Sequence, residues 1–285
     1  RSIARRAGEP DRSINIVFQS AATISCNSHR SPSARMAAVM DQQPILSADA
    51  VHLDSRTRRA GRVAKIGTLG VIVTASVLLA VVWHTIHTTM SMQTGWKDFG
   101  LHPLLMTLAF GFLAPVSVTS YRGLEDCFNL KHGKAKLVHA SLMTAALVCG
   151  IAGVVDMWIV HEDKHPGIGY HLISIHSWIG LAALIAFGLQ WLTGFLTFYT
   201  PLLERLVTKR AWLPAHVFIG CFSVYGTLAA IDLGLLSMMY PSALNNHTSA
   251  AFVTPSQMQM KGAALLVLAL AGFVGLTLHG GRDRY

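Results

Sequence analysis

Four of the fourteen histidines in the chain share a local pattern that could serve a flat, metal-containing cofactor. His102 and His139 are each followed four residues later by a methionine, whereas His176 and His216 are each followed by a glycine. On a helix, residues i and i+4 lie on the same face. A porphyrin bound at the histidine would lie along that face, because glycine admits a ring close to the backbone and methionine packs softly against it. The pattern therefore predicts haem sites, each between an H-x-x-x-M helix and an H-x-x-x-G helix.

The elements that must carry these histidines are membrane spans. The 285 residues are 52% apolar and only 13% charged, which is about half the charged fraction of soluble domains. A bilayer core of about 30 Å requires about 20 apolar helical residues. Six stretches qualify: 66–88, 102–120, 136–160, 172–198, 213–239 and 260–279. The sequence predicts an all-α membrane protein, a bundle of six transmembrane helices with two haem sites in its core.

The formal net charge of +9 comes from basic residues whose positions along the chain indicate how the spans are oriented. A nucleic-acid-binding protein gathers its basic residues on one folded face, whereas here they stand in short runs between apolar segments, so no nucleic-acid partner is expected. Lys and Arg are concentrated in alternate connections, which the positive-inside rule assigns to the cytosol. These connections are 56–65, 122–136, 205–210 and 282–284. Both termini are therefore predicted to be cytosolic.

The predicted orientation pairs the four histidines by depth. His102 and His176 stand in the first turns of two spans that enter from the non-cytosolic side. His139 and His216 stand at the starts of two spans that enter from the cytosol. At about 1.5 Å rise per residue, the two pairs would lie roughly 20 Å apart. Ligation by two histidines leaves no open position on the iron, which favours electron transfer over oxygen chemistry.

The first 60 residues stand apart from the spans. Residues 1–35 are rich in Arg and Ser and are followed by Met36. They are either a transit peptide or read-through upstream of a start at Met36, and we favour the second interpretation. Residues 36–60 are mostly polar without helical periodicity, so we predict that 1–60 is a disordered segment and that 61–285 is the membrane domain.

Five short segments around the histidines resemble the cytochrome b561 family. They are Leu101–Met106 (LHPLLM), Tyr121-Arg122, Lys136–His139 (KLVH), Ser174–Gly180 (SIHSWIG) and Leu213–Gly220, which begins LPAH. The resemblance covers about residues 66–280. It implies a transmembrane ascorbate-dependent oxidoreductase that binds two haem b groups through the four histidines. It further implies electron entry from cytosolic ascorbate, exit to monodehydroascorbate or ferric chelates, and a homodimer.

An ascorbate site beside the inner haem, the one predicted between His139 and His216 near the cytosol, would need cations, because ascorbate is a monoanion at neutral pH. Lys136 lies three residues before His139 and so on the same helical face. Arg122 matches a family motif, and Arg210 lies six residues before His216. These three residues are the predicted substrate contacts, although anchoring by positive charge at the membrane surface explains most of the surrounding cations equally well.

On the non-cytosolic side, His171 lies five residues before His176. With His161, Lys164 and His165 it could capture a ferric chelate or an anionic radical, or it could belong to a merely polar loop. Asp156 and Asp232 stand in the outer halves of their spans, where proton release and simple hydrogen bonding both remain open.

Two other functions compete with transmembrane electron transfer from ascorbate. One is a haem-bearing relay subunit of a larger membrane complex that has no substrate site of its own. The other is a transporter or scaffold without haem. The sequence is compatible with the plasma membrane and with an internal acidic compartment.

Overall fold

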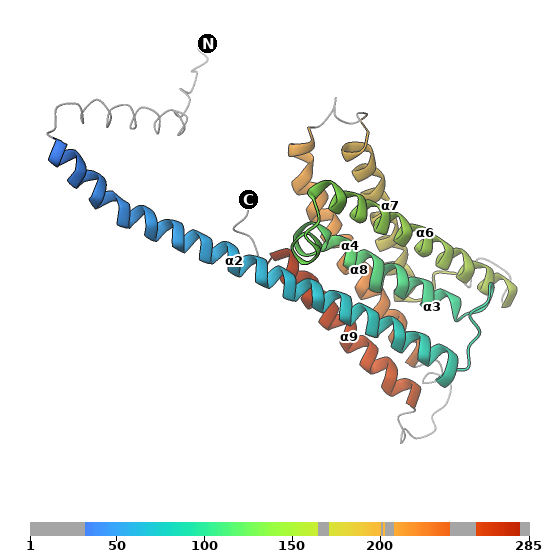
Figure 1. The fold of residues 1–285 in the computed structure, drawn as a ribbon. Helices are drawn as coiled ribbons and strands as arrows, with labels where there is room; N and C mark the ends of the chain where they lie inside the picture. Colours follow the sequence, from blue (N-terminus) through green and yellow to red (C-terminus); the bar gives the residue numbers. More distant parts are fainter. Residues whose placement is uncertain (1–31, 165–170, 201, 203–207, 240–254, 280–285) are drawn as a thin grey trace, which may run out of the picture. The chain divides into compact units, whose positions relative to one another are not determined.

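The computed structural model describes residues 32–164, 171–200, 202, 208–239 and 255–279, with side chains from Arg58 onward. The regular elements in these residues are all helices (Figure 1). The chain divides into two compact units, Arg1–Thr57 and Arg58–Tyr285. The second unit contains all four histidines of the two predicted haem sites.

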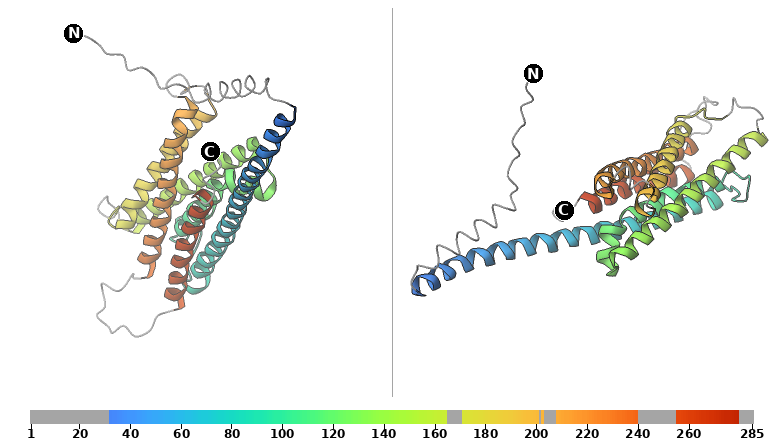
Figure 2. Two further views of the ribbon diagram at one scale, coloured as in Figure 1. Left: turned by 90° about the vertical axis from the view of Figure 1, so that its left-hand side faces the viewer. Right: turned by 90° about the horizontal axis from the view of Figure 1, so that it is seen from above.

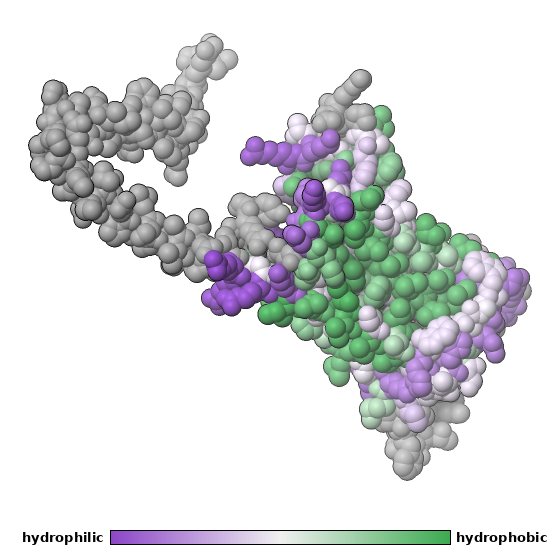
Figure 3. All heavy atoms as spheres, in the orientation of Figure 1, coloured by the Kyte–Doolittle hydropathy of each residue, from purple (hydrophilic) through white to green (hydrophobic). Residues whose placement is uncertain are grey.

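Six helical segments in the described residues are long and apolar enough to cross a membrane. They are Arg58–Thr89, Leu101–Val118, His132–Lys164, Ile175–Phe198, Lys209–Met239 and Pro255–His279. The predicted six-helix membrane fold is thereby confirmed. Large apolar side chains such as Val73, Leu189 and Phe222 are exposed on the outer faces of the bundle. The apolar surface lies between hydrophilic ends, as a lipid-facing surface requires (Figure 3).

The second span is built from three consecutive helical pieces, and the third to sixth spans are single helices. The pieces are α3 (Leu101–Met106), the π-helix η3 (Thr107–Leu113) and α4 (Ala114–Val118). The single helices are α6 (His132–Lys164), α7 (Ile175–Phe198), α8 (Lys209–Met239) and α9 (Pro255–His279). The second span packs on α6, and α7 packs on α8, so two antiparallel hairpins form the centre of the bundle (Figure 2).

The first and last spans lie against one another beside these hairpins (Figure 1). The first span combines the end of α2 (Pro32–His84) with the π-helix η2 (Thr85–Thr89). Gly67 and Gly70 of α2 let it approach α9 closely. A Cβ at Gly67 would lie 3.0 Å from the backbone nitrogen of Thr277, and one at Gly70 would overlap the ring of Phe273.

Proline changes the helix geometry in two spans. Pro115 in α4 cannot donate a backbone hydrogen bond, and the residues before it adopt the wider π-helical form in place of a regular α-helix. The sequence predicts Pro214 in the first turn of its span, but α8 begins at Lys209, which places Pro214 inside the helix. The prediction was wrong because the polar residues before the apolar stretch extend the helix by about one turn.

The same extension occurs at the start of α6, which begins at His132, before the expected first residue of the span. His139 and His216 therefore lie about two turns into their helices and not in the first turn. We call the end of the bundle that carries Lys136 and Arg210 the basic end.

The helix α2 begins at Pro32, where the sequence predicts a disordered tail over residues 36–60. The prediction of disorder rests on the absence of apolar residues at helical spacing in this segment. Ala, Met and Gln within residues 35–53 favour a helix by propensity, whereas Pro44 in the same stretch opposes one, so helix propensity alone does not account for this part of α2.

Candidate functional site

The outer pair of histidines, His102 and His176, lies at the end of the bundle opposite the basic end. His102 is the second residue of α3 and His176 the second residue of α7. Ser174 caps α7, since its side chain accepts a hydrogen bond from the backbone N–H of Ser177 at 3.1 Å. The centroids of the two imidazole rings are 6.1 Å apart and the rings are nearly perpendicular. The two rings are thus close enough to hold one metal-containing group between them.

Each ring of the outer pair is oriented by a backbone carbonyl of a neighbouring helix. Nδ1 of His102 lies 2.9 Å from the carbonyl oxygen of Gly153 in α6. Nδ1 of His176 lies 2.9 Å from the carbonyl oxygen of Ala230 in α8. A carbonyl oxygen can only accept, so each Nδ1 carries the proton and donates it. Nε2 is then the nitrogen with the lone pair, which is the state that binds a metal.

The inner pair, His139 and His216, lies toward the basic end. Nδ1 of His139 lies 3.0 Å from the carbonyl oxygen of Ser117, and the hydroxyl of Ser117 donates to the carbonyl of His139 at 2.9 Å. His139 lies within direct electrostatic range of His216. Phe198 packs edge-on against His216, with ring centroids 5.2 Å apart.

Gln190 of α7 contacts His216 through its side-chain amide. The amide nitrogen lies 2.7 Å from Nδ1 of His216 and also donates to the carbonyl of the same residue. The amide oxygen of Gln190 is buried and has no hydrogen-bond partner in the described part of the chain. Metal binding through Nε2 requires a proton on Nδ1, so the amide must turn to present this oxygen to it. The unpartnered oxygen supplies the acceptor that a ligated His216 needs.

Two glycines on the facing helices give the histidine rings room, and they differ from Gly180 and Gly220, which the sequence predicts to admit a porphyrin. A Cβ at Gly194 would lie 2.7 Å from Cε1 of His216, and one at Gly234 would lie 3.0 Å from Cε1 of His176. At the predicted positions the contacts are looser. The nearest atom to a Cβ is 3.8 Å away at Gly180 and 3.2 Å away at Gly220. A signal for Gly194 and Gly234 exists in their spacing, since each follows by four residues the residue that contacts Nδ1.

The two helices α7 and α8 thus hold their histidines reciprocally. His176 of α7 docks between Ala230 and Gly234 of α8. At the other end of the same helix pair, His216 of α8 docks on Gln190 and Gly194 of α7.

The residues present fit two haem groups. In the described residues, no three His, Cys, Asp or Glu side chains converge as ligands for a bare metal ion. A histidine pair suffices only where the other ligands belong to the cofactor, and a porphyrin supplies four nitrogens. The hydrogen-bonded Nδ1 atoms and the glycines against the rings are the features of histidines held for axial ligation.

Lys136 and Arg122 both contact carbonyls at the C-terminal ends of helices. Nζ of Lys136 donates to the carbonyl of Phe198, the last residue of α7, at 2.7 Å and lies 4.4 Å from the centroid of the Tyr199 ring. Nη1 of Arg122 donates to the carbonyl of Leu278 in the last turn of α9. A cation at a helix C-terminus compensates the partial negative charge there. Lys136 and Arg122 therefore have a structural role in addition to their predicted role as ascorbate contacts. Arg210 is exposed near the start of α8.

Tyr121 also lies at the basic end, although the sequence analysis did not select it as a site residue. Its ring centroid lies 5.3 Å from that of His139 and 5.4 Å from that of His132. Burial raises the pKa of Tyr121 to about 12, and the nearby Tyr199 and Glu125 shift it in the same direction. The hydroxyl is therefore protonated at neutral pH and available as a donor. The signal was present, because Tyr121 precedes Arg122 in one of the matching motifs.

His171 lies at the opposite end of the bundle in a defined packing environment. Its ring stacks on Trp158 with centroids 3.8 Å apart, and Nε2 lies 3.2 Å from a carboxylate oxygen of Glu162. His161 is nearby, with ring centroids 5.6 Å apart. Lys164 is exposed at the end of α6, and His165 lies outside the described residues.

Replacing Gln190 with leucine is expected to weaken haem binding at the inner site by roughly ten- to a hundredfold, which is the usual effect of losing the group that orients a ligating histidine. Leucine keeps the apolar bulk of the side chain but removes the acceptor for Nδ1. Haem titration of the apoprotein, followed by absorbance, measures the change. The outer site serves as the internal control and should retain its affinity; equal affinities in the variant and the parent protein would contradict a role for Gln190.

Comparisons with known proteins identify the family of the chain. The sequence model of the family described as eukaryotic cytochrome b561 matches residues 101–242. The chain is 33% identical over 179 residues to a probable ascorbate-specific transmembrane electron transporter of Oryza sativa, covering 61% of this chain and 73% of the relative.

Two further relatives cover more of the chain. Transmembrane ascorbate ferrireductase 2 of Arabidopsis thaliana is 30% identical over 220 residues, which is 76% of this chain and 91% of the relative. A plasma membrane ascorbate-dependent reductase of Xenopus laevis is 29% identical over 212 residues, covering 73% and 70% respectively. Residues 101–242, which the family model matches, include all four histidines of the two pairs. The chain belongs to the cytochrome b561 family.

Proposed function

We propose that this protein is a transmembrane oxidoreductase that takes electrons from cytosolic ascorbate and delivers them to a non-cytosolic acceptor, either monodehydroascorbate or a ferric chelate. Two haem b groups would be held by the outer pair, His102 and His176, and by the inner pair, His139 and His216. When bound, they supply one-electron redox chemistry. The names of the Oryza, Arabidopsis and Xenopus relatives support the class of donor and acceptor.

The observation that carries the proposal is the presence of two histidine pairs at different depths of one helical bundle. Three of the four Nδ1 atoms meet a carbonyl oxygen, and the fourth meets the Gln190 amide. The three carbonyl contacts orient their rings and keep Nε2 available, and the Gln190 amide does the same for His216 once its oxygen turns toward Nδ1. Because the outer faces of the bundle are apolar and lie in lipid, the two sites are separated from bulk water except at the ends.

On the cytosolic side, the residues of the basic end would receive ascorbate. Lys136, Arg122 and Arg210 contribute positive charge, which attracts the monoanion and favours its negative form. The protonated hydroxyl of Tyr121, beside His139, can donate a hydrogen bond to a substrate oxygen. Both termini lie on this side according to the distribution of Lys and Arg.

On the non-cytosolic side, His171 is the proposed acceptor contact. Its ring is held by Trp158 and Glu162 and lies near the start of α7, which carries His176. With Nε2 donating to Glu162, the ring can donate a second hydrogen bond, from Nδ1, to an anionic radical or to a carboxylate of a ferric chelate when it is protonated to the imidazolium form. The family resemblance also predicts a homodimer, which light scattering of the purified protein would measure.

The experiment that tests the function begins with the absorbance spectrum and the haem content of the purified protein. We expect two haems per chain, reduced by ascorbate. Vesicles loaded with ascorbate and containing the protein should then reduce external ferric citrate, whereas vesicles without the protein should not. Two haems that ascorbate fails to reduce would favour a relay subunit of a larger complex, and a protein without haem would contradict the proposal.

Replacing Lys136 with methionine is expected to weaken the use of ascorbate without removing haem, because the change deletes a cation near the inner site but no ligand. A hydrogen bond to a charged group contributes about 1.5 to 3 kcal/mol, and each 1.4 kcal/mol is about tenfold in binding. The apparent affinity should therefore fall roughly ten- to a hundredfold. Stopped-flow reduction at several ascorbate concentrations measures this change, and raising the ionic strength should weaken ascorbate use in the unaltered protein as well.

Lys261 provides the matched control, since it is an exposed lysine at the start of α9, a helix whose first turn lies at the other end of the bundle. Lys261→Met removes the same charge and should leave ascorbate kinetics unchanged. If Lys136→Met also left them unchanged with both haems bound, Lys136 would serve only to cap α7. The ascorbate site would then have to be sought around Arg122 and Arg210.

A further inference from the structure

Asp156 is a fully buried carboxyl group on α6, close to the outer site. It lies three residues after Gly153, whose carbonyl oxygen binds Nδ1 of His102. Residues three apart lie on the same face of a helix, so Asp156 and Gly153 face the same neighbour. Asp156 is also within electrostatic range of the His102 ring. A buried carboxyl group in a membrane span is costly unless it has a function or a partner.

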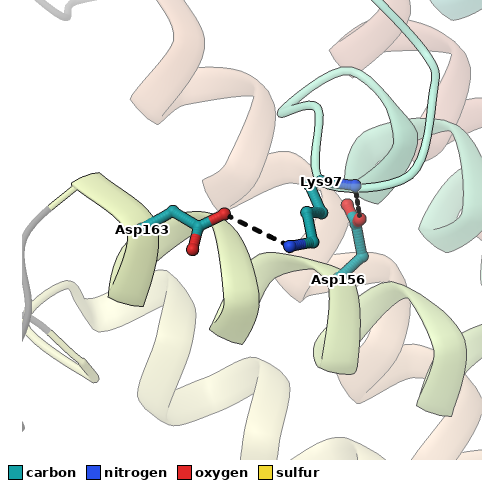
Figure 4. Close-up of polar contacts among 3 residues, drawn as sticks. All are labelled: Lys97, Asp156 and Asp163. Atoms are coloured by element: carbon teal, nitrogen blue, oxygen red, sulfur yellow. Dashed lines mark hydrogen bonds and ion pairs between the residues drawn. The ribbon is translucent and has the colours of Figure 1, made fainter.

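The partner of Asp156 is the backbone of the loop that leads into α3. Its Oδ1 accepts a hydrogen bond from the backbone N–H of Lys97 at 2.8 Å (Figure 4). Its Oδ2 is buried and has no hydrogen-bond partner in the described residues. The Nζ of Lys97 points instead toward Asp163, at 3.8 Å from a carboxylate oxygen (Figure 4). The bond between Asp156 and the loop therefore comes from the main chain of Lys97 and is separate from the ion pair that the Lys97 side chain makes with Asp163.

The loop conformation depends on such a restraint. Lys97 has a φ of 72°, in the left-handed region that residues other than glycine rarely adopt. The loop then closes tightly, because the N–H of Leu101 donates to the carbonyl of Asp98 at 3.0 Å. A Cβ at Gly100 would overlap the carbonyl oxygen of Gln93, so the chain passes too close there for a side chain. His102 follows two residues later, in the first turn of α3.

His102 is thus connected to α6 in two ways. Its ring contacts Gly153 directly, and the loop before it is fastened to Asp156 one turn farther along the same helix. A change at Asp156 alters the second connection and leaves the first intact.

We propose that Asp156 is a positioning residue for the outer haem site. Its Oδ1 fixes the loop that sets the start of α3, and its buried negative charge stabilises the oxidised, more positive form of the haem held by His102 and His176. The proposal rests on the function proposed above. It separates into a geometric part, which needs only an acceptor oxygen, and an electrostatic part, which needs the charge.

Two variants distinguish these parts. Asp156→Asn keeps an acceptor oxygen and removes the charge, whereas Asp156→Ala removes both. Asp163→Asn is the matched control, because it removes a carboxylate that also faces Lys97 but is 58% exposed, where water screens it. Amide hydrogen exchange of a peptide covering residues 93–101 reports the loop, and redox titration reports the midpoint potential of the outer haem.

We expect amide exchange of the loop peptide to accelerate by roughly ten- to a hundredfold in Asp156→Ala, as the loss of a hydrogen bond to a charged group predicts, and to change little in Asp156→Asn. The midpoint potential of the outer haem should rise in both variants, that of the inner haem should not, and Asp163→Asn should resemble the parent protein.

An unchanged outer potential in Asp156→Asn with both haems bound would overturn the electrostatic part. Unchanged exchange in Asp156→Ala would overturn the geometric part, and failure of this variant to fold leaves the potential of Asp156→Asn as the deciding measurement. A failure of the proposed function is distinguishable, because it would already be visible as missing haem in the spectrum of the parent protein.

Discussion

Replacing either member of the inner pair, His139 or His216, with alanine is expected to remove one haem, and the same one in both cases. Replacing either member of the outer pair, His102 or His176, should remove the other. The structure puts the outer rings 6.1 Å apart and the inner histidines within electrostatic range of each other. The loss should be nearly complete, because a haem bound by a single histidine lacks one of its two axial bonds.

Haem counts by pyridine haemochrome and redox titrations of the four single variants measure this outcome. Each variant should retain one haem, and the remaining midpoint potential should be the same within a pair and different between pairs. The double variant His139→Ala/His216→Ala should match its parent single variants. If variants of His102 and His139 lost the same haem, the pairing would be wrong.

Replacing Gly194 with alanine is expected to remove the inner haem although the change adds only one methyl group. The new Cβ would stand 2.7 Å from Cε1 of His216, closer than real Cβ atoms approach other heavy atoms. The ring cannot easily retreat, because Phe198 packs against it and Gln190 binds it. Overpacking of this kind costs about 1 to 3 kcal/mol. A displaced ring also loses the geometry for ligation, so the inner haem should be largely absent.

A glycine on α9 offers a control for the effect of alanine in a membrane helix. A Cβ at Gly272 would meet nothing within 4 Å, so Gly272→Ala should retain both haems. Gly234→Ala should disturb the outer haem less severely than Gly194→Ala disturbs the inner one, because the corresponding distance is 3.0 Å. Absorbance spectra and haem counts of the three variants measure these outcomes. An inner site that still binds a full complement of haem in Gly194→Ala would show that the packing at His216 is looser than the structure indicates.

Much of the architecture could be predicted because its causes lie in local sequence. Each span is an apolar stretch of sufficient length. His102 and His176 were placed together by depth alone, since both stand where a chain enters the bundle from the same side. The ends were less predictable. At Lys209 the helix continues beyond the apolar stretch because Lys, Arg and Ala at its start have high helix propensity, whereas at His132 it continues through Gly133, whose helix propensity is low.

The immediate surroundings of the histidines could not be predicted in the same way. Gly153 and Ala230 act through backbone carbonyls, and a backbone contact leaves no residue type to recognise. The close-approach glycines belong to the helix opposite each histidine, whereas periodicity relates only residues on one helix. Lys136 was selected for its charge beside His139, but its contact with the end of α7 depends on how two helices meet.

The reciprocal docking of α7 and α8 fixes the spacing between the two histidine sites along these helices. Along α7, fourteen residues separate His176 from Gln190, and along α8 fourteen separate His216 from Ala230. At 1.5 Å per residue, both helices measure the same interval of about 21 Å. Sliding one helix past the other would break both contacts at once, so the register is locked from both ends. A thicker or thinner bilayer can tilt this helix pair, but it cannot change the spacing of the two histidine levels along the pair.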